Sequence, residues 1–182
     1  MKRCILTGTP GAGKTSILRL LERLGHSVVE EAATAVIALE QARGEAEPWT
    51  RPRFIDEIVA LQRQRQERSA SAASCLQFHD RSPICTYALA AYSGRPVSAA
   101  LCAEIDRIER GRIYDRRVFF VRTIGFCAPT AARRISFAES LEFERVHEET
   151  YRALGYDLVD VPAGPLPDRV AAILAMSPDQ NP

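Results

Sequence analysis

Residues 3–15 read RCILTGTPGAGKT, a short apolar run followed by the pattern G-x4-G-K-T at Gly8–Thr15. The apolar run predicts a strand, and the leucines that follow at helical spacing predict a helix over Lys14–Leu24, closed by Gly25. A strand before the pattern and a helix after it distinguish a phosphate-binding loop from an ordinary glycine-rich turn. The sequence therefore predicts a site for the phosphates of ATP or GTP.

Several positions in this loop have a chemical role. Gly8, Gly11 and Gly13 allow the backbone to form a concave nest whose N–H groups point at phosphate oxygens. The helix that begins at Lys14 adds the positive end of its dipole. Lys14 supplies a charge for the β- and γ-phosphates, and the Thr15 hydroxyl is a ligand for Mg²⁺. The predicted nucleotide-binding residues are Gly8, Thr9, Pro10, Gly11, Ala12, Gly13, Lys14, Thr15 and Ser16.

A second acidic position follows the strand candidate at 75–79. Asp80 stands at its end, where an aspartate beside a phosphate loop holds Mg²⁺, usually through water. Aspartate is also favoured in the turns that enter helices, which is the alternative interpretation. Arg81 comes next, and a guanidinium at this place would neutralise charge in a transition state. We predict a metal site formed by Thr15 and Asp80.

Two glutamates follow the short strand predicted at 27–29. Glu30 and Glu31 would lie at the carboxyl end of a parallel sheet, where ligands bind. One of them would accept a proton from an acceptor hydroxyl or hold metal through water. Both would equally well complement the N-terminus of the helix predicted over 32–41. The sequence does not choose between the two acids.

The stretch 43–53 is polar and proline-rich, and the helix that follows has a strongly polar second half. We interpret 43–73 as an insertion that stands partly off the core and covers an acceptor. Local packing is an equal alternative for aromatic residues such as Trp49, because lone aromatics usually bury area for stability. The residues that would contact an acceptor are Trp49, Arg51, Arg53, Gln62 and Arg65.

A second segment, 125–135, has the composition of a mobile lid and contains Arg133 and Arg134. Arginines in a lid clamp transferring phosphates and exclude water, whereas solvated surface arginines are the alternative. A capping box at Ser136 and Glu139 predicts the start of the next helix. We expect 43–53 and 125–134 to be the most mobile parts of the unliganded protein.

Strands alternate with helices along the rest of the chain, which implies an α/β fold with a parallel sheet covered by helices on both faces. The 182 residues suit one domain, 1–182. A net charge of +1 argues against a broad nucleic-acid surface. No apolar run approaches the ~20 residues of a membrane span, and no signal peptide precedes the loop, so we expect a cytoplasmic protein.

Several motifs together resemble a known family. The loop, VVEEAA, FHDRSPIC and RRISFAESLEFERVHEETYRALGYDLVDVP are similar to the AAA-labelled ATPase family, which includes the ribosylnicotinamide kinase domain of the bifunctional NAD-biosynthesis regulator. The resemblance covers nearly the whole chain. It implies a P-loop NTPase fold like that of nucleoside and nucleotide kinases, a five-stranded sheet of order 2-3-1-4-5, ATP or GTP with Mg²⁺, and a lid whose arginines match Arg133 and Arg134. The step Asp80–Ser82 also resembles the acid-Arg-Ser step of deoxynucleoside kinases, which favours a small hydroxyl-bearing acceptor.

These patterns predict an ATP-dependent phosphotransferase that acts on a small, nucleoside-like molecule. The alternative is a nucleotide-dependent regulatory NTPase, a switch in which 43–73 binds a protein or lipid partner. Nucleic acid is not an expected partner. The acceptor, the choice of ATP over GTP and the oligomeric state are left open. The predicted catalytic residues are Lys14, Glu30, Glu31, Asp80, Arg81, Arg133 and Arg134.

Overall fold

Five short segments form one parallel sheet. The computed structural model describes residues 1–69, 75–123 and 137–178, except for the side chain of Phe137. The strands are β1 (Lys2–Thr7), β2 (Ser27–Val29), β3 (Leu76–Asp80), β4 (Arg117–Val121) and β5 (Asp157–Val161). Their order is β2-β3-β1-β4-β5, and every pairing is parallel. The predicted fold class and strand order are confirmed.

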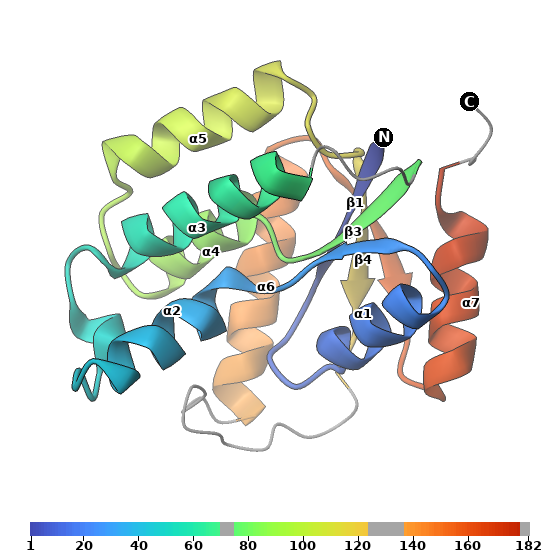
Figure 1. Ribbon diagram of the computed structural model, residues 1–182, viewed down its shortest axis with the longest axis horizontal. Coiled ribbons are helices and arrows are strands. Elements are labelled where there is room, and N and C mark those ends of the chain that lie inside the picture. Colours follow the sequence, from blue (N-terminus) through green and yellow to red (C-terminus); the bar gives the residue numbers. More distant parts are fainter. Residues whose placement is uncertain (70–74, 124–136, 179–182) are drawn as a thin grey trace.

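Helices cover both faces of this sheet (Figure 1). One face carries α1 (Lys14–Arg23) and α7 (Leu166–Met176). The other carries α2 (Ala32–Ala42), α3 (Phe54–Arg68), α4 (Pro83–Tyr92), α5 (Ala99–Arg110) and α6 (Phe137–Ala153), with the short 3-10 helix η1 (Pro48–Thr50) between α2 and α3. In the described part of the chain, none of these helices has the length and hydrophobicity that crossing a bilayer requires.

The central strand supplies both hydrophobic cores. Successive side chains of a strand point to opposite faces. Cys4 and Leu6 therefore pack in the core that contains α1 and α7, whereas Ile5 packs in the core beneath the other helices. All three are fully buried. A strand covered on both faces is expected to be a continuous apolar run, and β1 fits this expectation.

Helix α3 belongs to the core. Phe54 and Ile58 are 5% and 1% exposed and lie in the same cluster as Ile5. Its apolar face therefore packs on the core. In its polar second half, Gln66 is buried and accepts from Arg107 at 2.8 Å, whereas Arg63, Gln64, Glu67 and Arg68 are exposed. The interpretation of 43–73 as an insertion that covers an acceptor stays a prediction.

Strand β3 is buried along its whole length although it contains three polar residues, Gln77, His79 and Asp80. The His79 Nε2–H donates to the Gln77 Oε1 at 2.9 Å, and the Gln77 amide donates to the Ser27 hydroxyl at 2.9 Å. Burial, with a smaller contribution from Arg3, lowers the pKa of His79 to about 3, so the ring is neutral. These paired polar groups allow a strand of mixed composition to carry Asp80 to the edge of the sheet next to the loop.

Candidate functional site

The loop between β1 and α1 has the backbone conformation of a phosphate nest. Gly8, Gly11 and Gly13 have φ values of 122°, 85° and 88°, a region that residues with a side chain rarely adopt. At Gly8 an added Cβ would lie 2.2 Å from the carbonyl oxygen of Val121 at the end of β4. Any side chain at Gly8 would therefore force the loop away from the sheet.

A cavity of about 600 Å³ lies against this loop. Six of the nine predicted nucleotide-binding residues line it: Pro10, Gly11, Gly13, Lys14, Thr15 and Ser16. The other three, Gly8, Thr9 and Ala12, are buried beneath the loop surface. The loop thus offers one continuous face to a ligand, and its remaining residues support that face from behind.

The Lys14 side chain folds back onto the backbone of the phosphate loop. Its Nζ donates to the carbonyl oxygens of Gly8 at 3.1 Å and Thr9 at 2.7 Å, and the residue is 6% exposed. Burial, with a further contribution from the Arg81 charge, lowers the pKa of Lys14 to about 8. Among the described residues, the ammonium group therefore has only backbone oxygens as hydrogen-bond partners, and phosphate oxygens would stabilise its charged form.

This pKa predicts a pH dependence of nucleotide binding. We expect the affinity for ATP to fall between about pH 7 and pH 9, because Lys14 of the free protein loses its proton in that range and only the ammonium form attracts phosphate. Bound phosphates raise the pKa of Lys14 again, so ATP binding near pH 9 is accompanied by the uptake of a proton. Isothermal titration calorimetry in two buffers of different ionisation enthalpy measures this uptake. Lys14→Met should bind weakly without it, and a wild-type affinity that is flat with pH contradicts the prediction.

Thr15 and Asp80 form a pair that fits Mg²⁺. The Thr15 hydroxyl donates to Asp80 Oδ2 at 3.2 Å, and the buried Asp80 Oδ1 has no hydrogen-bond partner among the described residues. Burial, partly opposed by Lys14, raises the pKa of Asp80. No group of three or more His, Cys, Asp or Glu in the described ranges could hold a metal. Mg²⁺ needs no such group, because it usually combines one or two carboxylates with phosphates and water.

Arg81 and Glu31 both line the cavity and form an ion pair. Arg81 has a φ of 71°, and its Nε donates to Glu31 Oε1 at 2.7 Å. Burial alone would raise the pKa of Glu31, but Arg81 and the Thr34 hydroxyl, which donates to Oε2 at 2.6 Å, hold the pKa below its usual value. The same carboxylate keeps the pKa of Arg81 above its ordinary value despite burial. Both groups are therefore charged at neutral pH.

The structure separates the two glutamates that the sequence could not. Glu31 lines the cavity and contacts Arg81, whereas Glu30 is exposed and faces a different surface. Arg65 donates to the backbone carbonyl oxygens of Glu30 and Glu31 at 2.8 and 2.7 Å. Arg65 thus ties α3 to the end of β2 instead of lining the cavity, and it orients the turn from which Glu31 projects.

Helix α6 contributes residues that the sequence did not indicate. His147 is fully buried, and its Nδ1 lies 2.8 Å from the Phe143 carbonyl oxygen, so Nδ1 is the donor and Nε2 can accept from Arg81 Nη1 at 3.4 Å. Burial lowers the pKa of His147 to about 3. Tyr151, one turn further, bonds to the Ser82 hydroxyl at 2.8 Å. The spacing of Phe143, His147 and Tyr151 on one helix face was the available signal.

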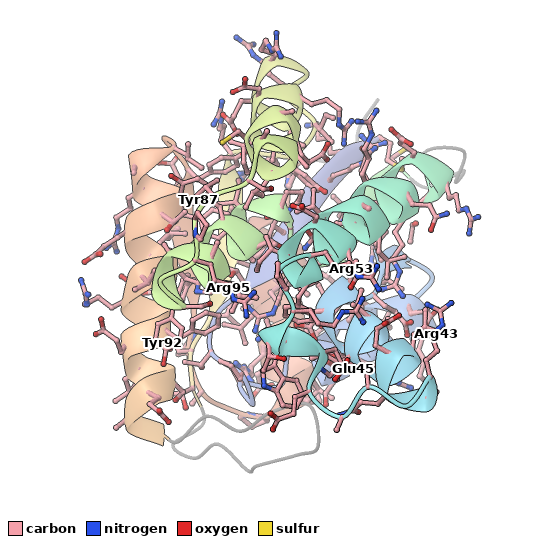
Figure 2. The ribbon with its side chains drawn as sticks, turned by 90° about the vertical axis from the view of Figure 1, so that its left-hand side faces the viewer. Arg43, Glu45, Arg53, Tyr87, Tyr92 and Arg95 are labelled. Carbon is pink, nitrogen blue, oxygen red and sulfur yellow. The ribbon has the colours of Figure 1, made fainter. Side chains whose placement is uncertain are left out.

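Part of the cavity lining is apolar and aromatic, and we call this part the aromatic half. It includes Ile37, Trp49, Phe54, Ile58, Leu89, Tyr92 and Phe143. Figure 2 shows Tyr92 at the end of α4 next to α6. The centroids of the Tyr92 and Phe143 rings are 4.9 Å apart. Gln62 is the main polar group of this half, and its Oε1 accepts from the Thr86 hydroxyl at 2.9 Å.

Apart from Arg81, the described arginines near the aromatic half of the cavity contact carboxylates and backbone carbonyls and do not line the cavity. Arg51 pairs with Glu40 and Glu57, and the Arg53 side chain is 69% exposed. Arg95 donates to the carbonyl oxygens of Trp49 and Arg51, and it lies between α4 and the start of α3 (Figure 2). Of the five residues expected to cover an acceptor, Trp49 and Gln62 therefore line the cavity, and the three arginines do not.

Two predicted site residues cannot be placed. Arg133 and Arg134, with the whole segment 125–135, lie outside the described residues. The predicted mobility of 43–53 and 125–134 also stays a prediction.

Comparisons with known proteins agree with this fold. A family model described as AAA domain matches residues 3–169. No curated protein sequence matches the chain. A structure of deoxyadenosine kinase from M. mycoides, with dCMP and dCDP bound, superposes with a TM-score of 0.62 at 15% identity, over 95% of this chain and 97% of that chain.

The NadR protein in complex with NAD and AMP-PNP superposes with a TM-score of 0.66 at 18% identity, over 96% of this chain and 48% of that chain. NadR in complex with NR gives a TM-score of 0.63 at 17% identity, over 88% and 43%. The chain thus spans about half the length of NadR. At these identities the likeness establishes a shared P-loop kinase fold.

Proposed function

The chain belongs to the AAA domain family, and we propose that it is an ATP-dependent phosphotransferase for a small, hydroxyl-bearing, nucleoside-like molecule. One observation carries the proposal. The phosphate loop, the aromatic side chains, Glu31 and Arg81 all line one cavity, and the Arg81 guanidinium carbon lies 5.9 Å from the centre of the Phe143 ring. A hydroxyl presented from the aromatic half would reach the site of the γ-phosphate beside a carboxylate and a guanidinium.

The charges favour an acceptor that carries no phosphate of its own. A phosphorylated acceptor would require a cation with unused donors. In the described ranges Arg51, Arg65 and Arg95 donate to carboxylates or backbone carbonyls, and Arg81 is paired with Glu31. The aromatic half instead suits a flat uncharged ring, stacked against Trp49 or Phe143, with Gln62 as its polar partner.

Each residue would have a defined role in transfer. Lys14 and the loop N–H groups bind the β- and γ-phosphates, and Arg81 neutralises charge on the transferring group. Glu31 accepts the hydrogen bond of the acceptor hydroxyl and takes its proton as the bond from that oxygen to the γ-phosphorus forms and the bond from the γ-phosphorus to the ADP oxygen breaks, so that ADP leaves. Thr15 and Asp80 would hold Mg²⁺, which would offset the negative charge of the phosphates. The fold that the chain shares with deoxyadenosine kinase supports phosphate transfer as the reaction.

A screen for the acceptor tests the proposal. Purified protein with ATP and Mg²⁺ is incubated with nucleosides, vitamins and sugars, and phosphorylated products are detected by mass spectrometry. We expect one or more nucleosides to be phosphorylated at a hydroxyl and nucleoside monophosphates not to be. Phosphorylation of monophosphates alone contradicts the charge argument. If no acceptor is found while slow ATP hydrolysis and nucleotide-dependent binding of a protein or lipid are observed, the regulatory NTPase is the correct function.

A further inference from the structure

Arg169 is a buried cation behind the phosphate loop, and it does not line the cavity. It lies in the first turns of α7 and is 6% exposed. Its Nη1 donates to the carbonyl oxygen of Ala12 at 2.8 Å, and its Nη2 donates to that of Arg122 at 3.2 Å. One guanidinium thus joins the loop after β1 to the end of the neighbouring strand β4.

The bond to Ala12 determines where the next N–H group points. The carbonyl and N–H of a trans peptide point in opposite directions, and the described backbone has no cis peptide bonds. Because the Ala12 carbonyl is held on Arg169 behind the loop, the Gly13 N–H is turned toward the cavity, which Gly13 lines. Arg169 also lies close to Gly13 itself, since an added Cβ there would be 3.2 Å from Nη1.

The charge of Arg169 has no counter-charge in the described part of the chain. Its partners are two backbone oxygens, and its buried Nε has none. Arg122, by contrast, pairs with Glu144, Glu148 and Asp160. A buried cation without an anion is costly for a folded protein. The triphosphate of a bound nucleotide is the anion that would come nearest to it.

We propose that Arg169 is a positioning residue of the nucleotide site, which turns the Gly13 N–H toward the phosphates and places an uncompensated positive charge beneath the loop. The ligand it serves is the polyphosphate of a nucleotide. The proposal rests on nucleotide binding by the loop and is independent of the acceptor. Its test therefore needs no phosphate transfer, and failure to find an acceptor leaves the test unaffected.

Substitution of Arg169 tests the proposal. Arg169→Met keeps much of the length and loses the charge and both bonds, and Arg169→Lys keeps the charge but not the two-point bridge. We expect Arg169→Met to weaken ATP binding about tenfold or more, the usual scale for a lost hydrogen bond to a charged group, and Arg169→Lys to weaken it less. Calorimetry on the folded variants gives the dissociation constants for ATP.

Arg117→Met is the matched control. Arg117 also joins β4 to α7, through a bond from Nη1 to the Met176 carbonyl at 3.1 Å, but at the sheet edge away from the loop. A purely structural role for Arg169 would lower the melting temperature and leave the affinity for ATP unchanged. Wild-type affinity in Arg169→Met overturns the proposal, as does an equal loss in Arg117→Met. If Arg169→Met does not fold, Arg169→Lys decides: weaker binding supports the proposal and unchanged binding overturns it.

Discussion

Replacement of Lys14 by alanine should lower the rate of nucleotide turnover by ~10² or more, the range seen when a main electrostatic stabiliser is removed. Lys14 is the cation of the loop, and in the part of the chain that the structure describes its Nζ bonds only to the carbonyl oxygens of Gly8 and Thr9. With ATP bound, the Lys14 ammonium group would interact with the γ-phosphate and stabilise its negative charge in the transition state. ATP consumption, measured with and without an acceptor, gives the rate.

The sequence provides a matched control, because Lys2 and Lys14 are its only lysines. Lys2 is exposed at the start of β1, and the phosphate loop follows the other end of that strand. Lys2→Ala should therefore turn over nucleotide at the wild-type rate. The two lysines also allow chemical labelling, in which an amine-reactive reagent modifies Lys14 more slowly when ATP is bound. Full turnover by Lys14→Ala would show that the loop does not bind phosphate productively.

The fold could be predicted because its signals are local. The strand, the glycines and the helix of the phosphate loop are contiguous, and the conformation of that loop requires glycine at Gly8 and Gly13. Strand β3 was harder to identify, since Gln77 and His79 are polar yet buried, and each satisfies the other. The burial of Gln66 in helix α3 could not be predicted for the same reason: a buried polar residue with a partner has the same sequence signature as an exposed one.

The contacts between site residues that are distant in sequence were harder to predict than the residues themselves. Arg81 and Glu31 are 50 positions apart, and their contact depends on the strand order that places β2 next to β3. Arg169 carried no signal at all, because its partners are backbone carbonyls, which every residue has. Lys14 was predicted from the loop motif, and Asp80 from its place at the end of a strand candidate. Their catalytic roles, like that of Glu31, remain predictions.

Replacement of Glu31 by glutamine should lower phosphate transfer by roughly 10²–10⁴-fold, the usual contribution of a positioned general base. Glutamine retains an oxygen that can accept from Arg81 Nε, where Glu31 now accepts at 2.7 Å. The guanidinium would keep its orientation, so the loss reports the missing base. Nucleotide affinity should be unaffected, because the loop contacts of Lys14 and Thr15 are unchanged.

Glu30→Gln is the matched control, since Glu30 is adjacent, exposed and outside the cavity. It should transfer phosphate at the wild-type rate. The dissociation constant for ATP and the transfer rate with the acceptor from the screen are measured for both variants. Equal, wild-type transfer by both would exclude Glu31 as the base and leave Asp80 as the next candidate. A large loss of ATP affinity in Glu31→Gln would instead show that the glutamate acts on the nucleotide half of the cavity, through its ion pair with Arg81.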